Sequence, residues 1–180
     1  MMEKIGVFCA SSNNMDTVYY DAARSLGEWI GKNGMTLVYG GANCGLMEAT
    51  AQAVKANGGK VFGVVPQRLV RENRVSDFID VTFHCEDLYD RKQWLVDESE
   101  VMVVLPGSVG TLDELFCALA ANMFGMNSKK VIIWNINGFY DLLIDFLESL
   151  NEKGVVNKPW CEMMYVANSL DEVTKLIKKN

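Results

Sequence analysis

Short apolar runs alternate with segments of helical periodicity along the whole chain, and this alternation limits the fold more than any other feature. In the helical segments apolar residues recur at helical spacing, as at Ala22, Leu26 and Ile30. The apolar runs cover residues 5–10, 36–39, 61–65, 101–105 and 131–134, with shorter ones at 81–83 and 164–166. The helical patterns cover residues 19–30, 46–56, 86–98, 111–124 and 139–150, and a last one starts near Leu170.

Strands that alternate with helices are joined by right-handed crossovers and lie parallel in one sheet. Because the apolar runs are continuous, we expect helices to bury both faces of that sheet. The chain therefore predicts an α/β fold, a Rossmann-like, doubly wound parallel sheet flanked by helices. Its 180 residues favour one domain that spans residues 1–180. Ligands of such sheets bind beyond the carboxyl ends of the strands.

Charge and composition narrow the possible partners. With 49% hydrophobic and 22% charged residues, the chain can build a sizeable core and does not have the composition of a disordered protein. The formal net charge of −6 repels nucleic-acid backbones, so we expect no nucleic-acid partner. A phosphate site in this protein should be local and suited to a small ligand.

The number and spacing of the cysteines, and the lengths of the apolar runs, indicate where in the cell the protein is located. The five cysteines are odd in number and widely spaced, which is typical of reduced cytosolic thiols. We find no signal-peptide pattern and no apolar run long enough to span a membrane, and so expect a cytoplasmic protein with no membrane partner. His84 is the single histidine, which excludes a histidine-rich metal site and argues against a Ser-His-Asp triad.

Two glycine clusters follow predicted strands. The first is Gly40-Gly41-Ala42-Asn43-Cys44-Gly45, which is either a tight turn without a ligand or an anion site at the start of the next helix. The second is Pro106-Gly107-Ser108-Val109-Gly110-Thr111. We expect Thr111 to cap the helix that follows and to point its hydroxyl at an anion. Two such turns could hold one phosphate from two sides.

Charged residues surround the second cluster. Glu114 lies one helical turn past Thr111, where a carboxylate would handle a proton or a positive charge rather than a phosphate. Asp113 is a binding candidate, although an interaction with the helix dipole explains it better. The pair Arg91-Lys92 either reaches the same pocket or belongs to a solvated helix face. Residues 67–80 are charged and irregular, which predicts a mobile loop over the site.

Motifs over nearly the whole chain resemble the LOG (Lonely Guy) family of cytokinin riboside 5′-monophosphate phosphoribohydrolases, often labelled lysine decarboxylases. They are G-V-F-C-A-S-S, V-Y-G-G-x-x-x-G-L-M, G-V-V-P, R-K, L-P-G-x-x-G-T-x-x-E and N-G-F-Y. The resemblance implies that Arg91 and Glu114 are catalytic. The binding residues that it implies, together with Asp113, are Gly40, Gly41, Gly45, Glu72, Lys92, Gly107, Ser108, Val109, Gly110 and Thr111.

The implied reaction is hydrolysis of the N-glycosidic bond of a nucleoside 5′-monophosphate, of the AMP or N6-prenylated AMP type. The resemblance also implies a homodimer and neither a metal nor an organic cofactor. A carboxylate beside the sugar suits this reaction, because bond breaking builds positive charge there. The alternative is a non-catalytic carrier of a nucleotide or phosphorylated cofactor on the same fold. Lysine decarboxylation is not favoured, because the chain has no recognisable pyridoxal-phosphate lysine motif.

The chain departs from the family pattern at four places. Ser108 replaces a customary glycine, so it either strains the loop, if its φ is positive, or adds a phosphate donor. Ala10 also replaces a glycine. Tyr89 stands where many members have histidine, and the segment 118–121 lacks the usual Thr-Trp. The last two positions line the base side of the pocket in the family, so the base preference stays open.

Overall fold

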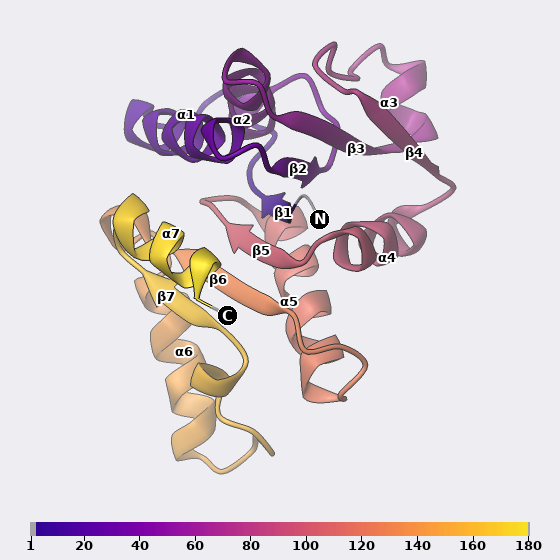
Figure 1. Ribbon diagram of the computed structural model, residues 1–180. Helices are drawn as coiled ribbons and strands as arrows, with labels where there is room; N and C mark the ends of the chain where they lie inside the picture. Colours follow the sequence, from indigo (N-terminus) through magenta and orange to yellow (C-terminus); the bar gives the residue numbers. More distant parts are fainter. Residues whose placement is uncertain (1–2, 180) are drawn as a thin grey trace.

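One parallel sheet runs through the chain in the computed structural model, which describes residues 3–179 (Figure 1). Its seven strands lie in the order β4-β3-β2-β1-β5-β6-β7. The chain winds outward from β1 to β4 and then returns to place β5 beside β1, so the winding direction reverses between these two strands. The strands are β1 (Lys4–Phe8), β2 (Thr36–Tyr39), β3 (Lys60–Pro66), β4 (Val81–Cys85), β5 (Val101–Val104), β6 (Lys130–Trp134) and β7 (Tyr165–Ala167).

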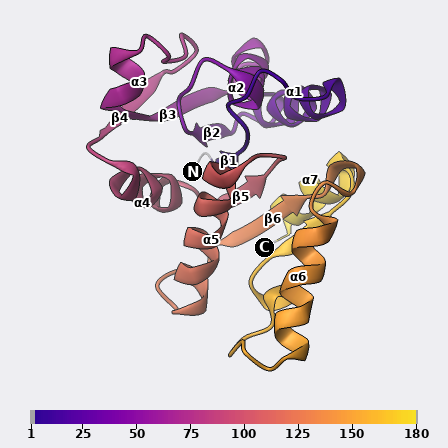
Figure 2. The same ribbon diagram turned by 180° about the vertical axis from the view of Figure 1, so that it is seen from behind.

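Helices cover both faces of this sheet (Figure 2). The helices α1, α2 and α7 pack on one face, and α4, α5 and α6 pack on the other. The predicted α/β class and the doubly wound parallel sheet are therefore confirmed. The helices are α1 (Thr17–Lys32), α2 (Gly45–Ala56), α3 (Gln67–Arg71), α4 (Leu88–Glu98), α5 (Val109–Met123), α6 (Asp141–Glu152) and α7 (Leu170–Lys178).

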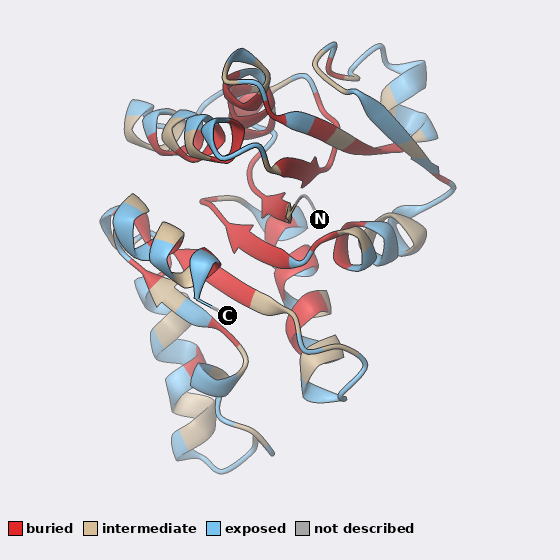
Figure 3. Cartoon of the chain, viewed as in Figure 1, coloured by how far each residue is buried: buried red, intermediate tan, exposed pale blue. Residues whose placement is uncertain are grey.

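The central strands are buried on both faces, as Figure 3 shows. In β5, Val101 and Val103 point into the core beneath α1, α2 and α7, whereas Met102 and Val104 point into the core beneath α4 and α5. Side chains alternate across a strand, so an unbroken apolar run serves two cores at once. Each fully buried side chain of this size contributes about 1.5–3 kcal/mol. No helix within residues 3–179 has the length and apolarity needed to cross a membrane.

The expectation for residues 67–80 is wrong in part. Residues 67–71 form α3, which begins after Pro66 and is supported by a 2.6 Å contact from Arg68 Nε to Glu72 Oε1. The remainder is tied to the first glycine cluster, because Asn43 N donates to the carbonyl of Arg74 and Ser76 N donates to that of Gly41. The segment is therefore anchored to the cluster by backbone hydrogen bonds.

Candidate active site

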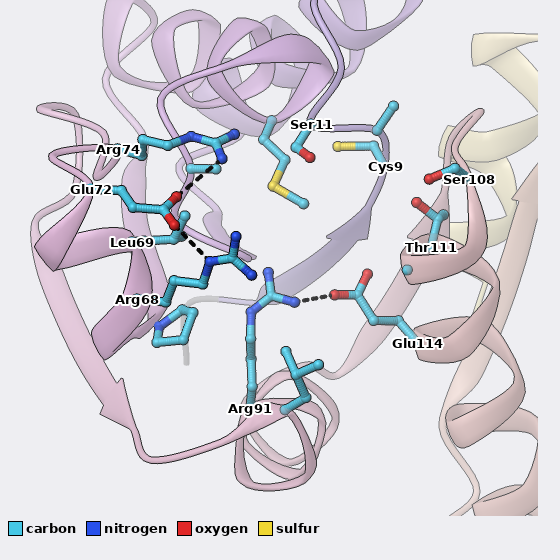
Figure 4. Close-up of a pocket in the computed structure, with 16 residues that line it drawn as sticks. Cys9, Ser11, Arg68, Leu69, Glu72, Arg74, Arg91, Ser108, Thr111 and Glu114 are labelled. Carbon is cyan, nitrogen blue, oxygen red and sulfur yellow. Dashed lines mark hydrogen bonds and ion pairs between the residues drawn. The ribbon is translucent and has the colours of Figure 1, made fainter.

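A cavity of about 330 Å³ lies beyond the carboxyl ends of β1, β2, β3 and β5, next to the place where the winding direction reverses (Figure 4). This is the position expected for a ligand of a doubly wound sheet. Its walls come from segments far apart in the sequence. The lining residues are Cys9, Ala10, Ser11, Ala42, Met47, Pro66, Arg68, Leu69, Glu72, Arg74, Leu88, Arg91, Ser108, Gly110, Thr111 and Glu114.

The start of α5 forms one wall of the cavity. The first backbone hydrogen bond of this helix runs from Leu112 N to Ser108 O, at 3.0 Å. Within the described residues, the amides of residues 109–111 donate no hydrogen bond. Free amides at a helix N-terminus, together with the helix dipole, favour an anion such as phosphate. The hydroxyls of Ser108 and Thr111 face the cavity beside them.

One expectation for this turn is corrected, and one alternative is decided. Ser108, not Thr111, occupies the N-cap position, because α5 begins at Val109; Thr111 lies buried inside the first turn. The φ angle of Ser108 is −100°, so a serine fits there without backbone strain. Its hydroxyl makes no capping hydrogen bond and is therefore available to a ligand.

Gly107 is required by close packing. A Cβ at this position would lie 2.0 Å from Thr111 Oγ1. The loop is also held from behind, because Tyr140 Oη donates a 2.8 Å hydrogen bond to the carbonyl of Leu105, and Ala10 N donates to that of Pro106. These contacts fix the path of the chain into α5.

A buried ion pair forms the floor of the cavity. Arg91 Nη1 on α4 donates to Glu114 Oε1 on α5 at 2.8 Å, with only 13% and 5% of the two side chains exposed. Arg91 Nη2 donates to the carbonyl of Gly40 at 3.2 Å. A Cβ on Gly40 would lie 1.9 Å from that nitrogen, so glycine makes room for the guanidinium. Arg91 therefore points into the molecule and is not part of a solvated helix face.

Burial raises the pKa of Glu114 above its ordinary value, and the charge of Arg91 opposes this shift. The net direction is upward, so the carboxyl holds its proton to a higher pH than an exposed glutamate does. Arg91 Nε is buried without a hydrogen-bond partner in the described chain, which leaves one donor for a ligand or a water molecule. The pair thus places a carboxyl group with a raised pKa beside a buried cation.

Two arginines and a glutamate form the opposite wall. Arg68 Nε lies 2.6 Å from Glu72 Oε1, and Arg74 Nη1 lies 3.4 Å from Glu72 Oε2. Arg74 Nη2 also donates to Cys44 Sγ at 3.3 Å. The hydrogen bond from Arg68 is the largest of the causes that lower the pKa of Glu72. Glu72 therefore lines the cavity, and the binding role that the resemblance implied for it stays a prediction.

Comparisons with known proteins identify the family of this chain. Residues 47–177 match the model of the family described as "Possible lysine decarboxylase". The cytokinin riboside 5′-monophosphate phosphoribohydrolase LOG3 of Arabidopsis thaliana is 31% identical over 176 residues, which cover 98% of this chain and 82% of the relative. The chain belongs to the LOG family. A second LOG phosphoribohydrolase of that plant, LOG5, is 32% identical over 176 residues, or 97% of this chain and 77% of the relative.

Solved structures similar to this LOG-family protein include molybdenum cofactor proteins. The molybdenum cofactor binding protein of Rippkaea orientalis has a TM-score of 0.75 at 25% identity, covering 99% of this chain and 96% of that one. The molybdenum cofactor carrier protein of Chlamydomonas reinhardtii has a TM-score of 0.76 at 23% identity, covering 99% and 100%. The second likeness shows the fold alone.

Several predicted binding residues lie beside the cavity but do not line it. Lys92 Nζ contacts Asp113 Oδ1 at 2.8 Å. Like the Arg91–Glu114 pair, this contact joins α4 to α5, through the neighbouring residue of each helix. Their hydrogen bond raises the pKa of Lys92. Gly107 and Val109 flank the lining residue Ser108. The binding roles of Lys92, Asp113 and Val109 in this LOG-family chain stay predictions.

The first glycine cluster shapes the backbone. Gly41 and Gly45 have positive φ angles of 77° and 61°, and a Cβ on Gly45 would meet the carbonyl of Ser12 at 2.6 Å. Gly45 N donates to Asn13 Oδ1, and Leu46 N donates to the carbonyl of Ala10. Because these amides at the start of α2 are already used, the geometry does not support a phosphate held from two sides. A binding role for the cluster stays a prediction.

The departures from the family pattern fall in different places. Ala10 lines the cavity, and its backbone N–H donates to the carbonyl of Pro106, two residues past the end of β5. Tyr89 is 79% exposed and lies outside the cavity lining, which has Leu88 instead. Residues 118–121 also lie outside it, so neither departure lines the cavity.

Sequence reasoning missed the arginines of the far wall, Arg68 and Arg74. The available signal was position: both lie in the charged segment that directly follows the carboxyl end of β3. Cys9, Ser11 and Met47 on the cavity surface were also missed as site residues. Ser11 belongs to a motif on which the family resemblance rests. No local pattern, however, indicated which side chains of that motif face the cavity.

Proposed function

We propose that this LOG-family protein hydrolyses the N-glycosidic bond of a nucleoside 5′-monophosphate and releases a free base and ribose 5-phosphate. AMP and N6-prenylated AMP are the substrate types that the resemblance implies. The observation that carries the proposal is the buried Arg91–Glu114 pair one helical turn from the free amides of α5. A phosphate at those amides would bring the sugar beside the carboxylate.

The chemistry follows from that placement. The bond between C1′ and the base nitrogen breaks, its electron pair leaves with the base, and positive charge builds on the sugar. Ionised Glu114 stabilises this charge and accepts a proton from the water that attacks C1′. The departing base takes up a proton from solvent, and Glu114 releases its own proton to solvent, so the products are neutral base and ribose 5-phosphate and the carboxylate is restored. Acid–base help of this kind contributes about 10²–10⁴-fold in rate. The phosphate, held away from the breaking bond, positions the sugar. Arg91 orients Glu114 and stays protonated throughout.

Release of ribose 5-phosphate from AMP and from N6-prenylated AMP tests the proposal. We expect release by the wild type, and its loss in Glu114→Gln while nucleotide binding, measured by calorimetry, persists. Glu152→Gln removes an exposed carboxylate at the end of α6 and serves as the control that keeps activity. Unchanged release by Glu114→Gln would rule out the carboxylate's role.

A carrier of a nucleotide or phosphorylated cofactor is the second candidate. The structure of the molybdenum cofactor binding protein of Rippkaea orientalis, at 25% identity, is similar to this chain and favours the carrier. The Arg91–Glu114 pair favours the enzyme, because binding alone does not need a buried carboxylate near an anion site. Nucleotide binding by the wild type without any turnover would favour the carrier. Lysine decarboxylation is not supported, because no lysine lines the cavity.

We also propose that the protein is a homodimer that associates through α5. Exposed apolar side chains lie along α5 and in the turn after it, with Phe124 exposed at 76%; they are Phe116, Met123, Phe124 and Met126. Exposed apolar groups of this kind are typical of protein interfaces. Light scattering should give the mass of a dimer, and Phe124→Asp should shift it toward the monomer. A wild-type monomer would contradict this proposal.

A cytoplasmic location is proposed on the state of the cysteines. Cys9, Cys44, Cys85, Cys117 and Cys161 are all free thiols in the structure. Free thiols persist in reducing compartments, where disulfides are rare. Fractionation of cells with an antibody against the protein would test this location.

A further inference from the structure

The loop that follows β1 lies beside the turn that leads into α5, although the two are far apart in the sequence. β1 and β5 are parallel neighbours, and Phe8 is paired with Val104 near the ends of the two strands. The chains stay together beyond this pair, because Ala10 N donates a 3.1 Å hydrogen bond to the carbonyl of Pro106. Ser11 comes directly after Ala10, so it leaves the sheet next to the turn at residues 106–111.

Ser11 brings polar groups without partners to the cavity. Its side chain lines the cavity and is exposed. Within residues 3–179, neither its hydroxyl nor its backbone N–H takes part in a hydrogen bond. Figure 4 shows Ser11, Ser108 and Thr111 around the end of the cavity that lies away from the Arg91–Glu114 pair. Free donors from β1 and from α5 therefore meet at the same end of the cavity.

These donors match a phosphate group. A phosphate monoester carries three terminal oxygens, all of which accept hydrogen bonds. The amides at the start of α5 and the Ser108 hydroxyl reach such a group from α5 alone. The first glycine cluster does not supply the remaining partners, because the amides of Gly45 and Leu46 are already used. Ser11 supplies a hydroxyl and a backbone N–H on the neighbouring strand end.

The backbone N–H of Ser11 favours a phosphate over a sugar. An amide N–H only donates, and a serine hydroxyl can donate as well. Two donors side by side suit a group that only accepts, whereas a sugar hydroxyl both donates and accepts. Hydrogen bonds from such donors to an oxyanion are about twice as strong as those between neutral groups.

We infer that Ser11 is a phosphate-binding residue, and that donors from the end of β1 and from the start of α5 share the phosphate of the ligand. The identity of that ligand as a nucleoside 5′-monophosphate rests on the proposed function. The hydrogen bond from Ala10 to Pro106 keeps the two sets of donors in register, so the phosphate site is formed before the ligand arrives.

Calorimetry with ribose 5-phosphate, and with inorganic phosphate as its competitor, measures the contact. We expect Ser11→Ala to raise the Kd of both probes by about tenfold or more, because hydrogen bonds to charged groups are the stronger ones. Ser11→Thr keeps a hydroxyl and should keep most of the affinity. Ser12→Ala is the matched control, because Ser12 is exposed, lies outside the cavity lining and accepts a hydrogen bond from Asn14 N. It should leave both Kd values unchanged.

Neither probe contains a base, so the measurement does not depend on the reaction. Weaker binding of both probes by Ser11→Ala, in a protein that does not hydrolyse AMP, would overturn the proposed reaction and support the phosphate contact. Weaker binding of ribose 5-phosphate alone would place Ser11 at the sugar and overturn the inference. Unchanged binding of inorganic phosphate, an equal loss in Ser12→Ala, or a wild type that binds neither probe would overturn it as well.

Discussion

Arg91 Nη1 lies 2.8 Å from Glu114 Oε1 across 23 residues of sequence, in a contact almost closed to solvent. The guanidinium reaches this place because Gly40 has no side chain. A buried charge pair with further hydrogen bonds is strongly sensitive to loss of one partner. Activity, stability and pH dependence should therefore all report on this contact.

The pH profile of the reaction should show the raised pKa of Glu114. The base must be ionised to accept a proton, so activity falls as the pH drops through the pKa of this carboxyl. Burial raises that pKa above the ordinary 4.5. We expect the acid limb of kcat/KM for ribose 5-phosphate release to lie above pH 4.5. A limb at or below that value would assign the base to an exposed group.

Replacement of Arg91 by alanine should destabilise the protein more at high pH than at low pH. Without the opposing charge of Arg91, the pKa of Glu114 rises further. A folded-state pKa above the unfolded value contributes stability at low pH that is lost as the pH rises through the folded pKa. Leaving this carboxylate buried and unpaired costs about 3–5 kcal/mol.

Urea unfolding of Arg91→Ala at pH 5 and pH 8 measures this difference. Lys32→Ala removes the partner of Glu28 in an exposed pair on α1 and should change the free energy of unfolding little at either pH. Equal destabilisation of Arg91→Ala at the two pH values would show that Glu114 does not titrate in this range.

Gly40→Ala should lower activity without unfolding the protein. The new Cβ would lie 1.9 Å from Arg91 Nη2, so the guanidinium must move away from Glu114. A displacement of about 1 Å in a group that positions the reacting atoms reduces the rate by about 10²-fold. Circular dichroism and kcat/KM together measure the effect. Gly34→Ala adds the same Cβ at an exposed turn outside the cavity lining, where nothing lies within 4 Å. Its φ of 67° strains an alanine, so this control should lose some stability but keep the kcat/KM of the wild type.

Tyr140→Phe should loosen the turn at residues 106–111, where the proposed function places the phosphate. The lost hydroxyl leaves the carbonyl of Leu105 without its 2.8 Å hydrogen bond. An unsatisfied buried acceptor costs about 1–3 kcal/mol. Because Leu105 directly precedes the turn at 106–111, we expect KM for the nucleotide to rise more than kcat falls. Tyr165→Phe, at an exposed tyrosine, is the matched control, and an effect of equal size there would contradict the prediction.

The alternation of apolar runs with helical periodicity was enough to predict the class of the fold, because strand and helix periods are local properties of the chain. The same alternation located the turn at 106–111. A helix that follows a buried strand has free amides at its start in any arrangement of the sheet, and the glycines between the two let a ligand approach them. Local patterns could not assign the N-cap of α5 to Ser108 rather than Thr111, because the two hydroxyl residues offer equivalent caps in sequence.

Tertiary structure alone decided which charged residues meet. The order of the strands brings the end of β2 next to α4 and α5, so Gly40, Arg91 and Glu114 come into contact from three separate segments. The same winding brings Arg68 and Arg74 across the cavity from Ser108. Periodicity has a range of a few residues, whereas packing joins residues that are far apart in the chain. For that reason a catalytic role for Arg91 and Glu114 was implied by resemblance alone, and the geometry of the pair came only with the fold.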